Sequence, residues 1–370
     1  MTGSGISLAR RGATVVGLRL ATAAVGLVVG LGILELAFGS WLRSNPWGRA
    51  LALNIVVNRG IVYDATVLYE NGGPVVYTKD QYGLRGTYGD PGDISILTVG
   101  GSTTDQRYIA DGLTWQDELE RALRDSGKNV RVANAGVDGH STFGHLASYR
   151  SWFPLIPNLR PTYTLLSVGI NDFFVDRPVA EFEGTADGSV TLTSRMKADS
   201  ALYRLYSLAR GTWLARRVRL DHVPIRAQTL TYTETPNLRH HDAIARARFR
   251  GFERRMAALL QLVRTSRSVP VCVTQPTLYY RHNPAGTVVG VDFAIDTIPE
   301  GDINGVDYFY LRLAQDTIML SSCRAVGAPV IDLASEQWEH EDFYDLVHST
   351  PRGAKKVGQR VAEAMKTLPF

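Results

Sequence analysis

Ser102 is the candidate nucleophile of this sequence because of its position. It closes the stretch Ile94–Thr104, in which an apolar run rich in β-branched residues ends at two glycines and a hydroxyl cluster. Such a run predicts a buried strand that delivers the serine into a tight turn. Asp345 and His348, three residues apart near the C-terminus, can both reach a serine that comes from another strand. The turn sequence alone also fits an ordinary structural turn, so the assignment depends on the rest of the chain.

The loop that carries Asp345 and His348 comes directly before a predicted helix. Thr350 or Ser349 can cap this helix, and Pro351 suits its first position. The alternative interpretation of His348 is an ordinary surface histidine.

Five short apolar runs supply the strands that must position these side chains. They are Ile94 to about Gly100, Val130–Ala133, Tyr163–Val168, Ser268–Thr274 and Ala328–Leu333. Helical patterns separate them, notably Ala243–Thr265 and Tyr308–Val326, and this alternation predicts βαβ units with a parallel sheet. Ligand sites in such sheets lie at the carboxyl ends of the strands. Ser102, Gly139 and Asn171 all fall just after a predicted strand end.

Four short motifs, taken in order, resemble the marker blocks of the SGNH (GDSL-like) hydrolase family, in its membrane-anchored subtype. They contain Ser102, Gly139, Asn171 and the pair Asp345/His348. The resemblance covers roughly Ile94–Thr367 and is weakest between Phe173 and Asn237. It implies a flavodoxin-like, three-layer α/β/α fold around a parallel sheet of about five strands.

The resemblance also implies a role for each residue. His348 would be general base and then general acid, and Asp345 would hold the imidazole in the required tautomer. The oxyanion hole would consist of the backbone N–H groups of Ser102 and Gly139 and the side-chain amide of Asn171. Taken singly, Gly139 also fits a turn glycine, and Asn171 with Asp172 fits a helix cap. Asp172 is interpreted as structural.

The first motif departs from the family pattern, because Gly101 stands where the acid of Gly-Asp-Ser is expected. This leaves the local backbone geometry open. The Gly-x-Ser-x-Gly elbow of the α/β-hydrolases is absent as well, since Thr104 occupies the position of its last glycine.

The N-terminal segment differs from the rest of the chain in its long apolar stretch. Residues 12–42 are long and apolar enough to span a bilayer if Arg19 and Glu35 lie near its two faces. We interpret this segment as an uncleaved, single-pass anchor in the cell inner membrane. Arginines on its N-terminal side orient the body toward the periplasm or another extracytoplasmic space. The alternative is a signal peptide cleaved near Ala37-Phe38-Gly39.

The chain therefore divides into three parts by sequence. Residues 1–42 form a cytoplasmic tail and transmembrane helix, and residues 43–93 form a stem that packs on the catalytic domain and includes a hairpin-like stretch at Val75–Gly86. Residues 94–370 form the hydrolase domain, with an Arg-rich insertion at about 174–237.

The region 201–267 contains fourteen arginines and no lysine against four acidic residues. Its apolar residues from Leu202 to Leu214 follow a helical pattern. A solvated helical face explains these features, and so would contact with anionic lipid headgroups or with an anionic polymer. An extracytoplasmic location disfavours nucleic acid as a partner.

Composition places few limits on function. With 370 residues, 45% hydrophobic and 21% charged, the chain has ample material for a core. Cys272 and Cys323 suit either a disulfide or two buried thiols. The adjacent His240 and His241, and the pair His140 and His145, lack the spacing and partners of a metal site. No nucleotide fingerprint occurs, so neither a metal nor a cofactor is expected.

The sequence thus predicts an extracytoplasmic serine esterase with a Ser-His-Asp triad. The favoured substrate is an O-acetyl group on a surface or exported carbohydrate, which would amount to polysaccharide deacetylation. The alternatives are an O-acyltransferase that uses the same triad, a lipid esterase or lysophospholipase, and a non-catalytic subunit of a polysaccharide assembly complex.

Overall fold

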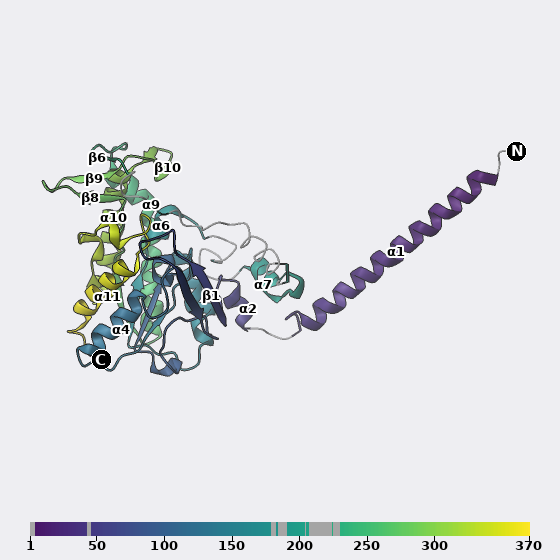
Figure 1. Ribbon diagram of the computed structural model, residues 1–370, viewed down its shortest axis with the longest axis horizontal. Coiled ribbons are helices and arrows are strands. Elements are labelled where there is room, and N and C mark those ends of the chain that lie inside the picture. The colour runs from purple at the N-terminus through teal and green to yellow at the C-terminus, as the bar shows by residue number, and fades with distance from the viewer. Residues whose placement is uncertain are drawn as a thin grey trace.

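The structure is a computed structural model that describes residues 4–42, 46–178, 183, 191–203, 205, 206, 224 and 230–370. Its body is built around one five-stranded parallel sheet with strand order β12-β7-β5-β3-β4. The strands are β3 (Ile96–Gly100), β4 (Val132–Asn134), β5 (Tyr163–Ser167), β7 (Val269–Val273) and β12 (Val330–Ile331). Each lies within or overlaps one of the five predicted runs. The predicted three-layer α/β/α fold is therefore confirmed (Figure 1).

Helices α4 (Trp115–Asp125) and α11 (Pro351–Met365) cover one face of the sheet. A capping box begins α4, where Thr114 and Asp117 each accept a backbone N–H of the other. The start of α11 is as predicted, since Thr350 accepts the N–H of Gly353 and Pro351 is the first helical residue.

Helices α5 (Thr142–Ser151), α9 (His241–Thr265) and α10 (Gly305–Ala325) cover the other face. Successive residues of β3 show the two-layer arrangement, because Ile96 packs among the residues under α4 and α11 and Leu97 packs among those under α5 and α9. A disulfide joins Cys272 in β7 to Cys323 in α10, with the two Cα atoms 6.4 Å apart. Both cysteines are fully buried, so this bond fixes α10 to the sheet.

The prediction of a hairpin-like stretch at Val75–Gly86 is wrong. Strand β2 (Pro74–Lys79) instead pairs backward with β1 (Arg59–Asp64) in an antiparallel ribbon. The chain after β2 turns away at Gly83, whose φ is 78°, and Arg85 makes a bridge to Asn134 at the end of β4. The second half of the expected hairpin is therefore attached to the central sheet.

A second small sheet was not foreseen from the sequence. Strands β6 (Tyr232–Thr233), β9 (Val288–Val291) and β8 (Tyr280–His282) form it in the order β6-β9-β8, and the ribbon of β10 (Asp296–Ile298) and β11 (Gly301–Ile303) lies nearby. Figure 1 shows these strands at the end of the molecule opposite the C-terminus.

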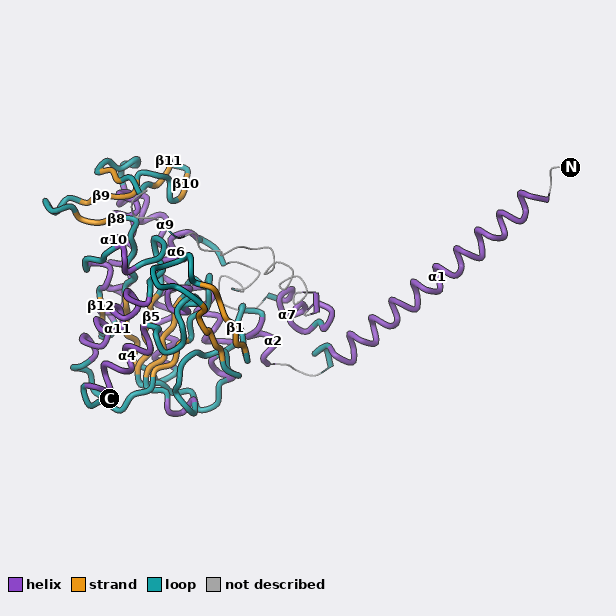
Figure 2. The backbone as a smooth tube through the Cα atoms, in the orientation of Figure 1, coloured by secondary structure: helices purple, strands orange, loops and turns teal. Residues whose placement is uncertain are grey.

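Helix α1 (Ser4–Phe38) projects away from the body, and Figure 2 shows it as one uninterrupted coil. Its segment Leu18–Phe38 has 21 residues and a mean hydropathy of 2.1, which is long and apolar enough to cross a membrane. At about 1.5 Å per residue it spans roughly 30 Å, the thickness of a bilayer core. The same features also fit a signal sequence.

The end of α1 is held by Glu35. Its carboxylate accepts the backbone N–H groups of Ala201 at 3.2 Å and Leu202 at 2.9 Å. It also accepts the indole N–H of Trp41 at 2.7 Å. These bonds attach the helix end to the segment that follows α7 (Leu192–Asp199), near α2 (Pro46–Leu51). Most of the helical pattern expected at 202–214 lies outside the described residues.

Candidate active site

Ser102 begins the short helix α3 (Ser102–Asp105) directly after β3. Its Oγ lies 2.8 Å from Nε2 of His348, and Nδ1 of His348 lies 2.6 Å from Oδ2 of Asp345. A proton on Nδ1 can be donated to the carboxylate, which leaves Nε2 free to accept the hydroxyl proton of Ser102. The structure thus brings together the three side chains that the sequence predicts to be catalytic. They have the arrangement that activates a serine.

The loop that holds Asp345 and His348 is rigidly built. Oδ1 of Asp345 accepts the backbone N–H groups of Val347 at 2.8 Å and His348 at 2.6 Å. The N–H of Tyr344 donates to the carbonyl of His348 at 2.9 Å. The Tyr344 ring stacks on the imidazole, with 5.6 Å between ring centres and 10° between planes. The imidazole is therefore oriented by its carboxylate and by ring packing.

The same loop is tied to the nucleophile segment by Gln106, the residue after α3. Its amide Nε2 donates to Oγ of Ser349 at 2.8 Å, and its Oε1 accepts the N–H of Trp115 at 2.8 Å. Gln106 has a φ of 51°, which ends α3 and aims the side chain at both partners. No motif in the sequence indicated a role for Gln106.

Asn171 follows β5 in the short helix α6 (Ile170–Phe174). Its Nδ2 donates to the carbonyl of His140 at 2.8 Å, which leaves one amide hydrogen for a ligand. Gly139 is the residue before His140. It has a φ of 80° in a turn closed by the N–H of His140 and the carbonyl of Val137, a conformation that favours glycine. The structure therefore places the two predicted oxyanion-hole residues on adjoining loops.

The glycine that replaces the expected acid at position 101 has a structural reason. A Cβ on Gly101 would lie 2.7 Å from Nδ2 of Asn171 and 3.1 Å from the carbonyl oxygen of His140. The first contact is shorter than real Cβ atoms show and the second is tight, so the Asn171 amide packs where a side chain would otherwise stand.

A small recess of about 10 Å³ lies beside Ser102, with Asn171 and Gln275 among its lining residues. Gln275 was not identified from the sequence, although it follows the predicted strand 268–274 in the way that Asn171 follows its own strand. Its Nε2 donates to Oγ1 of Thr103 at 2.7 Å, and its Oε1 accepts the N–H of Ile170 at 3.0 Å. Gln275 therefore supports both the nucleophile segment and the Asn171 loop.

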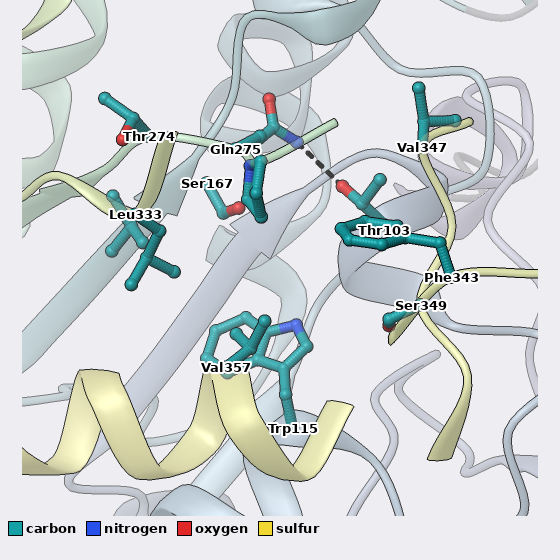
Figure 3. A pocket seen from close by; sticks show the side chains of 12 residues that line it. Thr103, Trp115, Ser167, Thr274, Gln275, Leu333, Phe343, Val347, Ser349 and Val357 are labelled. Atoms are coloured by element: carbon teal, nitrogen blue, oxygen red, sulfur yellow. Dashed lines mark hydrogen bonds between the residues drawn. The ribbon is translucent and has the colours of Figure 1, made fainter. Parts of the chain in front are cut away.

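A second pocket shares Thr103 and Gln275 with this recess. Figure 3 shows the hydrogen bond between these two side chains at its edge, with Trp115, Phe343 and Val357 among the apolar lining residues. Its volume is about 30 Å³. The Thr103–Gln275 pair thus stands between the recess at the serine and a mainly apolar pocket.

The residues expected to form the stem contribute buried charge next to the site. Nζ of Lys79 lies 2.9 Å from Oδ1 of Asp105 and donates to the carbonyl of Gly136 at 2.9 Å. Arg85 donates to the carbonyls of Asp105 and Gln106, each at 2.9 Å. These contacts join the end of α3 to the loop before Gly139, and no sequence motif indicated them.

Asp172 is buried and held by an ion pair and hydrogen bonds. It lies 3.0 Å from Arg255 and accepts the N–H of Thr142 at 2.9 Å. Burial raises the pKa of its carboxyl, against the opposing effect of Arg255 and the hydrogen bonds. This environment agrees with the structural role expected for Asp172. Among the described residues, no three His, Cys, Asp or Glu side chains are grouped to hold a metal ion.

The fold and this arrangement define an α/β/α protein with a serine–histidine–aspartate site at the carboxyl edge of its sheet. No protein-family model and no curated relative matches the chain. Solved structures similar to it include a member of the lipolytic G-D-S-L family from Veillonella parvula, with a TM-score of 0.40 and 14% identity over 74% of this chain and 98% of that one.

Two acetylxylan esterases are also similar. AlAXEase has a TM-score of 0.39 and 13% identity over 73% of this chain and 99% of that one. A variant of the enzyme from Geobacillus stearothermophilus has a TM-score of 0.38 and 11% identity over 74% and 94% of the respective chains. These neighbours include a member of the family that the sequence resembles.

Proposed function

We propose that the protein is a membrane-anchored serine esterase of the SGNH type that removes O-acetyl groups from a carbohydrate outside the cytoplasm. The observation that carries the proposal is the hydrogen-bonded chain from Ser102 through His348 to Asp345. With the Asn171 amide next to it, this chain supplies a nucleophile, a general base and an oxyanion donor.

Catalysis would proceed through an acyl-enzyme. Oγ of Ser102 attacks the ester carbonyl while His348 takes its proton, and the negative oxygen is stabilised by the N–H groups of Ser102 and Gly139 and by Asn171. The imidazolium then gives its proton to the leaving sugar hydroxyl. Water, activated by the same imidazole, releases the acid. Asp345 remains ionised and holds the imidazole in place throughout.

A short acyl group is supported by the dimensions of the site. The recess beside Ser102 has a volume of only about 10 Å³, and the Thr103–Gln275 hydrogen bond separates it from the pocket in Figure 3. This favours acetyl over a fatty acyl chain, and so a carbohydrate ester over a lipid.

The location outside the cytoplasm is supported by two features. The segment Leu18–Phe38 has the length and hydropathy of a membrane span, and a disulfide joins Cys272 to Cys323, which suits an oxidising compartment. An impermeant maleimide distinguishes the orientations in spheroplasts. A cysteine at exposed Val62 should react in intact spheroplasts, whereas a cysteine at Thr2 should react only after lysis. The reverse pattern would contradict the proposed orientation.

The activity is tested with aryl esters of increasing chain length, using the full chain in detergent or nanodiscs. Turnover should be greatest for acetate, should decline with chain length and should be lost in Ser102→Ala. Equal turnover by wild type and Ser102→Ala would refute the esterase. Product analysis with an added sugar acceptor separates hydrolysis from acyl transfer, because only transfer yields an acylated acceptor.

A further inference from the structure

A groove outside the catalytic constellation is much larger than the recess at the serine. Its volume is about 220 Å³, against about 10 Å³ for the recess. Three parts of the chain line it: strands β6 and β8 of the small sheet, the residues Thr277 and Leu278, and the segment 334–340.

The groove adjoins the catalytic loop. The N–H of Leu278, in its lining, donates to the carbonyl of Leu346 at 2.8 Å, and Leu346 lies between Asp345 and His348 in the chain. Thr277 is two residues beyond Gln275, which lines the recess at Ser102. A molecule in the groove therefore lies alongside the segment that carries the general base.

The lining of the groove is chemically suited to a ligand rich in hydroxyl groups. It presents phenol, guanidinium, imidazole, carboxylate and amide groups from Tyr232, Arg281, His282, His340, Glu336, Gln337 and Glu339. The lining contains both positively and negatively charged side chains, so the groove favours neither an anionic nor a cationic ligand. An aliphatic chain would desolvate these groups without pairing them, which is costly.

Thr277 has a hydroxyl at the edge of the groove that is unpaired among the described residues. It lines the groove and is only 7% exposed. Its Oγ1 is buried and has no hydrogen-bond partner in the described part of the structure. A buried hydroxyl left without a partner costs roughly 1–3 kcal/mol. Rotation of the Thr277 side chain toward the groove would let a ligand hydroxyl remove that cost.

The imidazole of His340 adds a group that can both donate and accept. Its Nε2 lies 3.4 Å from the hydroxyl of Tyr232. Burial, together with the nearby Arg281, lowers the pKa of His340, while Glu341 and Glu339 oppose this shift. His340 is consequently neutral at neutral pH, a state suited to hydrogen bonds with sugar hydroxyls.

We infer that this groove binds the glycan part of the substrate, a neutral O-acetylated oligosaccharide, with the Thr277 hydroxyl and the Arg281 side chain among its polar contacts. This inference rests on the proposed esterase function. It assigns acyl recognition to the recess at Ser102 and chain recognition to the groove.

The test compares two kinds of substrate on the full chain. One is 4-nitrophenyl acetate, which is too small to need the groove, and the other is a set of O-acetylated xylo-, manno- and chito-oligosaccharides. Thr277→Val and Arg281→Gln should each lower kcat/KM for the preferred oligosaccharide by on the order of three- to tenfold, as expected for loss of one hydrogen bond. Hydrolysis of 4-nitrophenyl acetate should not change.

Thr317→Val and Arg324→Gln are the matched controls, since both residues are exposed on α10, away from the groove lining. They should change neither activity. The inference is overturned if the groove variants lower both activities equally, if they leave both unchanged, or if none of the oligosaccharides is deacetylated faster than the aryl ester. The proposed esterase function would fail in a different way, because aryl acetate turnover would then persist in Ser102→Ala.

Discussion

The Cα of Gly101 and the side-chain amide of Asn171 are packed so closely that a Cβ at position 101 would lie 2.7 Å from Nδ2 of the amide. The residue before the nucleophile therefore limits where the oxyanion donor can stand. Gly101→Ala should displace the amide and lower kcat by on the order of a hundredfold, measured with 4-nitrophenyl acetate. Circular dichroism should show that the variant remains folded. If its kcat equals that of the wild type, Asn171 has room to move and this prediction is wrong.

Asn171→Ala removes the amide without adding bulk. Loss of one oxyanion donor typically raises the barrier by on the order of 3 kcal/mol, so kcat should fall by about a hundredfold or more, with little change in Tm. Asn171→Asp keeps the shape but places a carboxylate at the developing charge, and it should be at least as impaired. Full activity of either variant would exclude Asn171 from the oxyanion hole.

The ion pair between Lys79 and Asp105 is almost completely buried, with side-chain exposures of 4% and 3%. Lys79→Met leaves the carboxylate without its cation, which should cost about 3 kcal/mol or more of unfolding free energy. Urea unfolding measures this, and the double variant Lys79→Met/Asp105→Leu should recover part of the loss. If Lys79→Met were as stable as the wild type, the ion pair would not be needed for stability.

The disulfide should contribute strongly to stability. Cys272 and Cys323 are 51 residues apart in sequence, and closing a loop of that length in the unfolded chain corresponds to about 4 kcal/mol in the chain-entropy estimate. Cys272→Ala/Cys323→Ala should therefore unfold at a clearly lower urea concentration. A reductant should lower the unfolding midpoint of the wild type and leave that of the double variant unchanged. An equal shift in both proteins would show that the reductant does not act through this disulfide.

The bulk of the Gln275 side chain, which lies between the recess and the apolar pocket, should set the acyl-chain limit. Gln275→Ala opens the recess at Ser102 to the apolar pocket of about 30 Å³. The ratio of butyrate to acetate hydrolysis should rise, by roughly fourfold for each methylene accommodated, even though loss of the bond to Ile170 lowers both rates. Thr103→Val keeps the volume filled and should leave the ratio unchanged. A ratio that does not move in Gln275→Ala would contradict this role.

Much of the central sheet could be predicted from sequence because its strands are buried on both faces. Continuous apolar runs such as Tyr163–Val168 leave a clear signal, and the cap at Thr350 depends on adjacent residues alone. Strands β6 and β8 are short and partly exposed, so their sequences differ little from those of loops. A hairpin at Val75–Gly86 was a reasonable local interpretation that long-range pairing with β1 and with Asn134 overrode.

The same distinction applies to the site. Ser102, Asn171 and His348 stand at strand or helix ends, where residue type and position together indicate a role. Lys79 gives no such signal, because its partners Asp105 and Gly136 are brought to it only by tertiary folding. Gln275 lies between these cases, since its position at a strand end was visible but its contacts were not.

The long separation between the two halves of the site has a consequence for how the protein becomes active. Ser102 and His348 are 246 residues apart, and His348 is held by a loop that precedes the last helix of the fold. During synthesis the nucleophile therefore emerges long before its base. Until α11 docks beside α4, the serine has no imidazole to take its proton, so the nascent chain cannot hydrolyse esters. Hydrolytic activity is for this reason a direct assay of complete folding.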